Sequence, residues 1–296
     1  MPPTRSWLPL YLGIALSWGS AFIFIKSGLE FLTPFGIAFS RYALGGLAMM
    51  VIVVWRKIRL PANRTELFHI FMLSLVQSSL YGVLMALAQT RVTTALAGIA
   101  GALVPLVTFL AIAFVFRGEK LTRDQIMGLL IGLVGALAIS GFWLGFGDYP
   151  AWALLALLGC TICYGLSYPY TKKYILPYRT APEALVATQF GFSAVTLLPL
   201  FVFFGVRQAP STFTQVGSIL ALGVLCTGIS FVWNFKLISL AGSLVSSTVI
   251  YFVPVVAILI SVIFTSEKIT WYQLVGCSTV LFGAAVSQGR LRRKTR

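Results

Sequence analysis

Residues 7–29 read WLPLYLGIALSWGSAFIFIKSGL, an apolar run with Lys26 as its one charged residue. A helix that crosses a bilayer needs about 20 predominantly apolar residues, so this run is long enough to span a membrane. The apolar core of a cleavable signal peptide is shorter than this run, and Arg5 is the only basic residue before it. We therefore expect a retained transmembrane helix here.

Similar apolar runs fill the rest of the 296-residue chain, which is 58% hydrophobic and 10% charged. Soluble domains are about half apolar and about a quarter charged, so this composition predicts an all-α, polytopic membrane protein. Charged residues, Pro and Gly divide the runs into ten predicted transmembrane helices with short loops between them. The predicted helices are 7–29, 34–55, 67–88, 95–116, 125–144, 150–172, 182–205, 215–237, 243–264 and 270–288.

The net charge of +15 is distributed unevenly between alternate loops. With the N-terminus inside, 17 of the 22 Lys and Arg residues fall in inner loops and tails, 4 fall outside, and Arg41 lies within the second helix. Because cytoplasmic loops are enriched in Lys and Arg, this predicts a multi-pass protein of the inner (plasma) membrane with both termini cytoplasmic. Nucleic-acid binding is not expected, since no folded basic surface remains to carry it.

An internal repeat divides the chain into halves at 1–148 and 149–296, with five predicted helices each. The motif GEKLT at 118–122 returns as SEKIT at 266–270. Other landmarks return in the same order: Trp18-Gly19 as Tyr164-Gly165, and Val104-Pro105 as Val253-Pro254. Because five is odd, the second half must enter the membrane from the opposite side. This inverted repeat is an architecture of secondary transporters, in which a central site opens to each side in turn.

Pro105 and Pro254 occupy equivalent positions in the two halves. Proline removes a backbone hydrogen bond within a helix and bends it, freeing here the carbonyls of Gly101 and Ile250. Bends at equivalent positions suit gates around a central cavity, so we predict a gating role for both prolines. A static packing kink is the alternative.

Several motifs resemble the EamA branch of the drug/metabolite transporter superfamily. They are Trp18-Gly19-Ser20-Ala21-Phe22 followed by Lys26, Phe39-Ser40-Arg41-Tyr42, Pro105 followed by GEKL at 118–121, and the second-half residues Pro254 and Glu267-Lys268. The resemblance implies ten helices in two inverted repeats and export of amino acids or related metabolites. The aromatic-rich helices are most similar to an aromatic amino-acid exporter. The chain departs from the pattern at Ser266 and at Gln189, which stands where the first half has Arg41.

The predicted helices carry no central carboxylate, because all seven Asp and Glu residues fall at helix ends or in loops. We therefore expect no catalytic residues, no metal site and no cofactor, and we predict that the protein is not an enzyme. The four cysteines lie in apolar runs and are expected to be buried thiols. Arg41 lies about 10 Å into its helix, where it either pairs with a protein group, the interpretation we favour, or attracts a substrate carboxylate.

Neutral polar and aromatic side chains are the remaining candidates for binding a substrate in the membrane. Each also has a structural interpretation, as an interface aromatic or as a polar contact between helices. The predicted substrate-binding residues are Trp18, Gln77, Tyr81, Tyr164, Tyr168, Trp233, Asn234, Ser243, Ser247 and Tyr251.

The leading functional hypothesis is a transporter, monomeric or homodimeric, that exports a small-molecule substrate by alternating access. Aromatic or other neutral amino acids are the expected substrates. The alternative is an exchanger of phosphorylated or nucleotide-linked sugars. Such multiply anionic substrates need several Lys or Arg residues in the cavity, and only Arg41 and Lys26 qualify.

Overall fold

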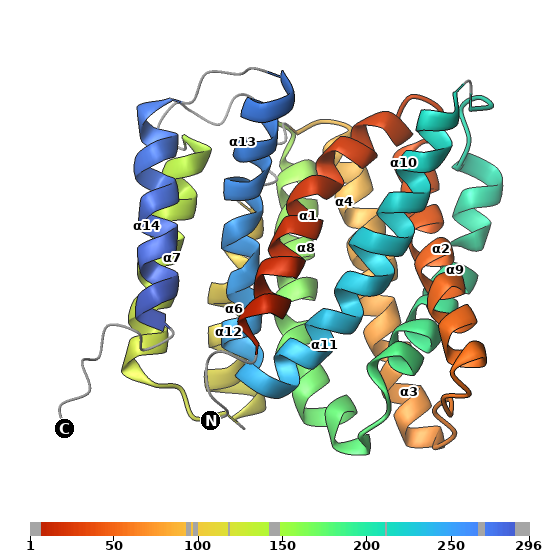
Figure 1. Ribbon diagram of the computed structural model, residues 1–296, viewed down its shortest axis with the longest axis horizontal. Helices are drawn as coiled ribbons and strands as arrows, with labels where there is room; N and C mark the ends of the chain where they lie inside the picture. Colours follow the sequence, from red (N-terminus) through yellow and green to blue (C-terminus); the bar gives the residue numbers. More distant parts are fainter. Residues whose placement is uncertain are drawn as a thin grey trace.

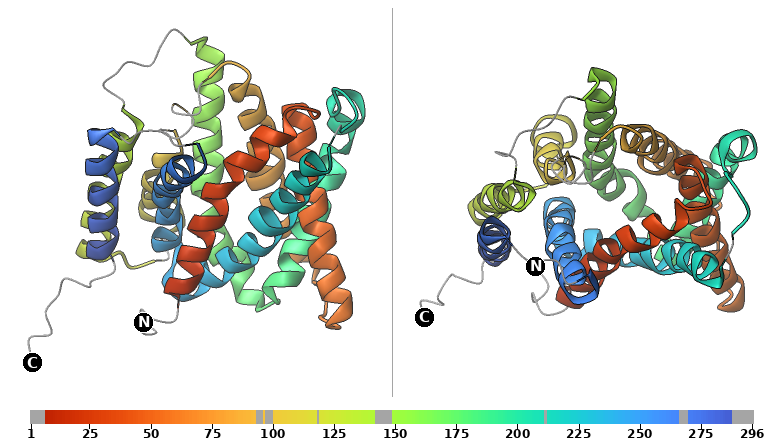
Figure 2. Two further views of the ribbon diagram at one scale, coloured as in Figure 1. Left: turned by 45° about the horizontal axis from the view of Figure 1, so that its top comes forward. Right: turned by 90° about the horizontal axis from the view of Figure 1, so that it is seen from above.

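The computed structural model describes residues 7–92, 96, 100–117, 119–141, 149–210, 212–265 and 270–287. Across these residues the protein is all-helical, and its only β-type pairing is an isolated bridge between Leu32 and Val206. The all-α prediction is therefore confirmed. The helices stand side by side in a bundle, with α7 and α14 forming a pair at one edge (Figures 1 and 2).

The first half contains α1 (Leu8–Gly28), α2 (Pro34–Trp55), α3 (Arg64–Leu73), η1 (Ser74–Leu80), α4 (Tyr81–Gln89), α6 (Val104–Leu110), η2 (Ala111–Phe116) and α7 (Arg123–Ser140). The second half contains α8 (Ala151–Tyr170), η4 (Thr171–Ile175), η5 (Leu176–Tyr178), α9 (Pro182–Phe204), α10 (Phe213–Gly223), η6 (Val224–Ile229), α11 (Ser230–Ala241), α12 (Ser243–Ser247), η7 (Thr248–Tyr251), α13 (Phe252–Thr265) and α14 (Trp271–Ser287). The segments η1 and η6 are π-helical turns within longer helices.

Within the described residues, six helices are long and apolar enough to cross a membrane. They are Leu8–Ile25, Pro34–Trp55, Arg64–Ala88, Ala151–Tyr178, Pro182–Phe204 and Phe213–Ala241. Two shorter apolar helices, Ala100–Phe116 and Ser243–Val256, lie among them. Six of the ten predicted spans thus meet the criteria of length and composition. The predicted boundary at residues 148 and 149 adjoins the undescribed stretch 142–148, and Ser266, Glu267 and the Lys26 side chain also lie outside the description.

The threonines that end the two repeated motifs begin equivalent helices. Thr122 and Gln125 form a reciprocal capping box at the start of α7, in which the Thr122 amide donates to Gln125 Oε1 at 2.9 Å. The Thr270 amide donates to Gln273 Oε1 at the same distance ahead of α14. Such caps satisfy amides that have no partner within the helix, so both helices begin at these positions.

Glycines let helices of the two halves approach closely at equivalent places. A Cβ added at Gly19 of α1 would lie 2.5 Å from Val256 of α13, and one added at Gly165 of α8 would lie 2.6 Å from Val107 of α6. Only glycine permits such an approach, which is a common way to pack membrane helices. The first helix of each half therefore packs against the Pro-containing helix of the other half.

Pro105 and Pro254 lie just after interruptions rather than inside continuous helices. Leu103 forms a turn ahead of α6, and the 3-10 segment η7 precedes α13. Each proline thus occupies the first turn of a helix, where its missing N–H costs no hydrogen bond. The two interruptions are adjacent, since a Cβ at Gly101 would lie 3.6 Å from Ile250. Their role in gating stays a prediction.

The α7–α14 contact yields a test of this packing. A Cβ at Gly135 would lie 2.7 Å from the Val280 amide nitrogen, so Gly135→Ala forces two backbones apart. We expect a loss of about 1–3 kcal/mol of stability, seen as a lower unfolding temperature in detergent. Gly217→Ala is the matched control, because nothing lies within 4 Å of a Cβ there. Equal unfolding temperatures for the two variants would contradict the packing.

Candidate functional site

Six aromatic side chains from six helices of both halves form a chain of ring contacts in the bundle interior, here called the central aromatic cluster. Its members are Trp18 (α1), Tyr42 (α2), Tyr81 (α4), Tyr164 (α8), Phe190 (α9) and Phe231 (α11). Successive ring centroids are 5.0 Å apart for Tyr81–Tyr164, 6.1 Å for Tyr164–Trp18, 5.8 Å for Trp18–Phe231, 5.0 Å for Phe231–Phe190 and 5.1 Å for Phe190–Tyr42.

A cavity of about 50 Å³ adjoins this cluster between α1, α2 and α4. Tyr42 and Tyr81, the two ends of the chain of ring contacts, both line this cavity, and Arg41 is the charged residue on its wall. The cavity holds about three or four water molecules. A metabolite of amino-acid size therefore requires the surrounding helices to move apart.

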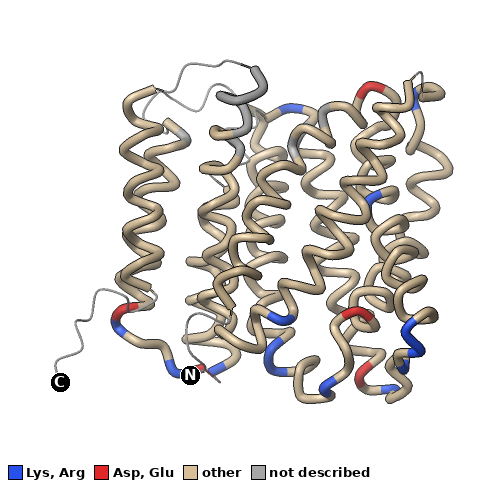
Figure 3. The backbone as a smooth tube through the Cα atoms, viewed as in Figure 1, with Lys and Arg blue, Asp and Glu red and all other residues tan. Residues whose placement is uncertain are grey.

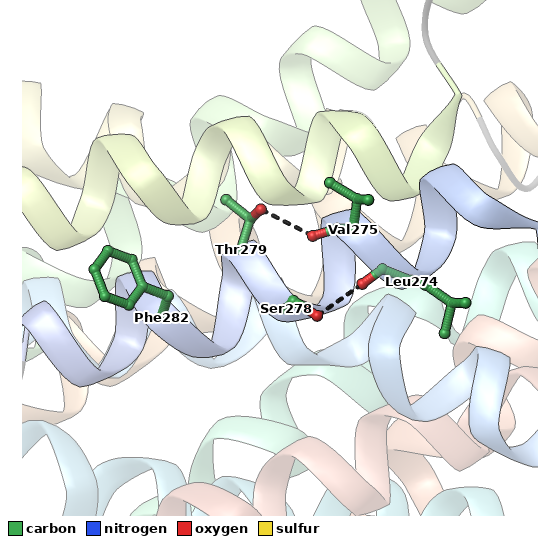
Figure 4. Close-up of a pocket in the computed structure, with 5 residues that line it drawn as sticks. All are labelled: Leu274, Val275, Ser278, Thr279 and Phe282. Atoms are coloured by element: carbon green, nitrogen blue, oxygen red, sulfur yellow. Dashed lines mark hydrogen bonds between the residues drawn. The ribbon is translucent and has the colours of Figure 1, made fainter.

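A larger hollow of about 430 Å³ lies on α14, but its chemistry does not suit a metabolite (Figure 4). One helix supplies all of its lining, and Leu274, Val275 and Phe282 are exposed. The Ser278 and Thr279 hydroxyls donate to carbonyls of their own helix, at 3.0 and 2.8 Å. Because both hydroxyl donors are engaged and the apolar side chains are exposed, we assign this hollow to the lipid-facing surface.

Gln77 lies beside the cluster in a hydrogen-bonded network that joins η1, α8 and α9. Its Nε2 donates to Ser167 Oγ at 2.8 Å, and its Oε1 accepts from Gln189 Nε2 at 3.0 Å. Gln189 Nε2 also reaches Ser78 Oγ at 3.2 Å. Gln77 is 1% exposed, so in this conformation its amide holds helices together and contacts no open space.

The predicted binding residues fall into separate groups. Trp18, Tyr81 and Tyr164 belong to the central aromatic cluster, and Tyr168 packs edge-on against Tyr164 at 5.7 Å. Trp233 instead lies against Gly13, and its ring would be 2.9 Å from a Cβ there.

Tyr251 is directed away from the central aromatic cluster. Its hydroxyl donates to the Leu129 carbonyl of α7 at 3.3 Å, and its ring covers Gly132. The Ser247 hydroxyl donates to the Leu244 carbonyl of its own helix at 2.8 Å, which leaves this donor engaged. In this conformation both side chains serve the packing of α12 and η7.

Ser243 is the first residue of α12, a helix that lies toward the lower side of the bundle in Figure 1. Its amide donates to Glu119 Oε2 at 3.0 Å, and Lys172 Nζ reaches the same oxygen at 2.7 Å. Gly242, with φ of +88°, brings this backbone close to the carboxylate. One carboxylate thus ties together the start of α12, the segment η4 and the chain before α7.

Four predicted residues have buried polar atoms without a hydrogen-bond partner in the described part of the chain: Trp18 Nε1, Tyr168 Oη, Asn234 Oδ1 and Ser243 Oγ. Trp18 Nε1 is a donor and Asn234 Oδ1 is an acceptor. Buried polar atoms are ordinarily paired, so an unpaired donor and acceptor in the interior are available to a ligand.

Three members of the central aromatic cluster were not predicted from the sequence: Tyr42, Phe190 and Phe231. The two phenylalanines lie in apolar runs among 23 in the chain, and nothing in the pattern distinguishes them. Tyr42 follows Arg41, whose charge within a membrane helix was the available indication.

A bundle with six helices long and apolar enough to cross a membrane, around an aromatic interior, is typical of polytopic membrane transporters. The chain belongs to the EamA-like transporter family, whose model matches residues 5–141 and again residues 151–288. This confirms the resemblance drawn from the sequence motifs.

Similar proteins are transporters by name. A probable terminal-alkyne amino-acid exporter of Streptantibioticus cattleyicolor is 30% identical, with 93% of this chain and 91% of that protein covered. An uncharacterized transporter of Archaeoglobus fulgidus is 24% identical over 94% of this chain and 97% of its own length. The uncharacterized inner membrane transporter YedA of Escherichia coli is 23% identical, over 95% and 91%.

A solved crystal structure has the same fold. It is 20% identical in sequence, with a TM-score of 0.81, and the match covers 98% of this chain and 100% of that one. The helical arrangement described above is therefore one found in an experimental structure.

The glutamine network predicts a structural effect. Gln189→Leu leaves Gln77 Oε1 buried without its donor, which costs about 1–3 kcal/mol. We expect a clearly lower unfolding temperature in detergent. Gln208→Leu is the control, because the Gln208 side chain is exposed and, among the described residues, donates to the Glu30 carbonyl alone. An unchanged unfolding temperature for Gln189→Leu would show that the network contributes nothing.

Proposed function

We propose that this transporter exports amino acids with aromatic or other neutral side chains by alternating access. The observation that carries the proposal is the central aromatic cluster, to which six helices of both halves contribute. Aromatic faces bind aromatic side chains and ammonium groups without a buried countercharge. The 30% identity to a probable terminal-alkyne amino-acid exporter supports the same substrate class.

The proposal includes ten membrane spans arranged as two inverted five-helix repeats. The twofold match to one family model, the equivalent glycine contacts and the equivalent helix caps support this arrangement. In Figure 1, α1 begins at the lower side and α8 begins at the upper side, as inversion requires. We propose that Pro105 and Pro254, beside adjacent interruptions, act where the helices bend as the site opens to each side.

The proposed orientation places the lower side of Figure 1 in the cytoplasm of a cell with an inner membrane. Figure 3 shows the Lys and Arg positions gathered most densely at that lower side. The first helix, α1, begins at that side and the last helix, α14, ends there, which favours cytoplasmic termini.

An exchanger of phosphorylated sugars has less support. Among the described side chains, Arg41 alone brings a positive charge to the cavity beside the cluster. A phosphate group is usually held by several cationic groups.

Flux measurements test the substrate class. In proteoliposomes holding purified protein, we expect saturable uptake of labelled phenylalanine or another neutral amino acid. Tyr81→Ala removes a wall of the cluster, so the ratio kcat/KM should fall about tenfold. Tyr178→Ala is the matched control, because Tyr178 is 37% exposed at the end of η5 and lies outside the cluster.

No flux for any amino acid in the wild type would refute the substrate class. Flux that is equal in Tyr81→Ala and in Tyr178→Ala would instead refute the placement of the site. Tyr81→Phe separates the roles of ring and hydroxyl, since it keeps the ring that faces Tyr164.

Labelling of introduced cysteines tests the orientation. Ala62→Cys lies in the exposed segment between α2 and α3, and Gln208→Cys lies in the exposed segment between α9 and α10. In intact cells, a maleimide that cannot cross membranes should label Gln208→Cys and spare Ala62→Cys. The four native cysteines are buried or half-buried and provide the background control. The opposite labelling pattern would reverse the proposed topology.

A further inference from the structure

We propose that Arg41 is the specificity-determining residue of the site and binds the carboxylate group of the substrate. The inference rests on the proposed function and deepens it, because it divides the site into an aromatic part and an anion-binding part. It makes a carboxylate, rather than an ammonium group alone, the feature that the protein recognises.

Arg41 is the eighth residue of α2, about 10 Å from its beginning. It is half-buried and lines the 50 Å³ cavity together with Tyr42 and Tyr81. These two tyrosines also belong to the central aromatic cluster. A ligand whose side chain rests on the cluster therefore has its polar end within reach of the guanidinium group.

The guanidinium is held in place by the packing of α2 against η6. A Cβ at Gly45 would lie 2.8 Å from the Gly223 carbonyl oxygen at the end of α10 and 3.1 Å from the Gly228 amide nitrogen of η6, so glycine is needed for this approach. The approach brings Thr227 to Arg41, and Arg41 Nε donates to Thr227 Oγ1 at 3.2 Å. Thr227 in turn donates to the Leu222 carbonyl at 2.8 Å, which fixes its oxygen as an acceptor.

The two terminal nitrogens of Arg41 have no hydrogen-bond partner among the described residues. The two salt bridges found there are Lys172–Glu119 and Lys236–Glu183, so neither involves Arg41. Besides the Thr227 hydroxyl, the guanidinium group has the Tyr42 ring as a neighbour, with the guanidinium carbon 5.4 Å from the ring centroid. A cation at this depth is costly unless it is paired.

A carboxylate fits this requirement. The free edge of a guanidinium group presents parallel N–H donors that match the two oxygens of a carboxylate. Tyr81, which lines the same cavity, carries a hydroxyl that is a candidate for a further donor. A single cation balances one negative charge, so the arrangement suits a monocarboxylate better than a phosphate ester.

Calorimetric titration of purified wild-type protein in detergent tests the inference with phenylalanine and phenylalaninamide, which differ only in the carboxylate. We expect the wild type to prefer phenylalanine. Arg41→Gln should reduce this preference by roughly 10- to 100-fold, the effect of removing a charge-assisted hydrogen bond, while affinity for the amide stays near its wild-type value. Arg41→Lys keeps the charge but loses the paired donors, so its preference should be intermediate.

Arg207→Gln is the matched control, because it removes the same charge from an exposed segment outside the cavity. Thr227→Val tests whether the Thr227 hydroxyl positions the Arg41 guanidinium group. It should weaken binding of phenylalanine more than binding of phenylalaninamide. Thermal unfolding of every variant establishes that it is folded before its titration is interpreted. An unchanged preference in a folded Arg41→Gln variant would overturn the inference.

A third probe, 3-phenylpropionate, separates failure of the inference from failure of the proposed function. If the wild type carries no amino acid but binds 3-phenylpropionate in an Arg41-dependent manner, amino-acid export is refuted and the carboxylate site stands. If phenylalanine is carried equally by wild type and Arg41→Gln with the same preference over the amide, export stands and the carboxylate site is refuted. Absence of binding by any carboxylate overturns both.

Discussion

The close approach of α1 to α13 at Gly19, matched by the approach of α8 to α6 at Gly165, is the contact on which the rest of the structure depends. In a bilayer the hydrophobic effect does not drive helices together, so association relies on close packing of small residues. The residues before these glycines are Trp18 and Tyr164. Because each helix is held at its glycine, the two aromatic rings meet 6.1 Å apart in the interior.

Much of the fold could be predicted from the sequence, because the hydrocarbon imposes its own pattern on the chain. Runs such as residues 34–55 coincide with a helix at both ends, and the repeated motifs mark helix caps in both halves. The choice of inward-facing aromatics was harder to predict. Tyr81 and Tyr164 meet in the interior, whereas Tyr251 covers Gly132 on α7. A uniformly apolar helix has no amphipathic face to tell these cases apart.

The contacts of polar residues within the membrane were equally hard to predict from the sequence. Gln77 was expected to bind substrate, and the structure places its amide between Ser167 and Gln189. Arg41 was expected to pair with a protein group, and only its Nε has found one among the described residues, the Thr227 hydroxyl. Sequence identifies polar groups that need partners in hydrocarbon, but the partners of Gln77 and Arg41 lie 90 or more residues away in the chain.

The cross-packing of the halves has a consequence for how the protein is made. Translation proceeds from the N-terminus, and α1 packs against α10, α11 and α13, all of which are synthesised in the second half. Likewise, α2 packs against α9, and α7 against α14. The glycine faces of the early helices therefore stay unpacked until the helices of the second half have been synthesised. Assembly is completed only after the ribosome has nearly finished the chain, and a truncated product retains few of its native helix–helix contacts.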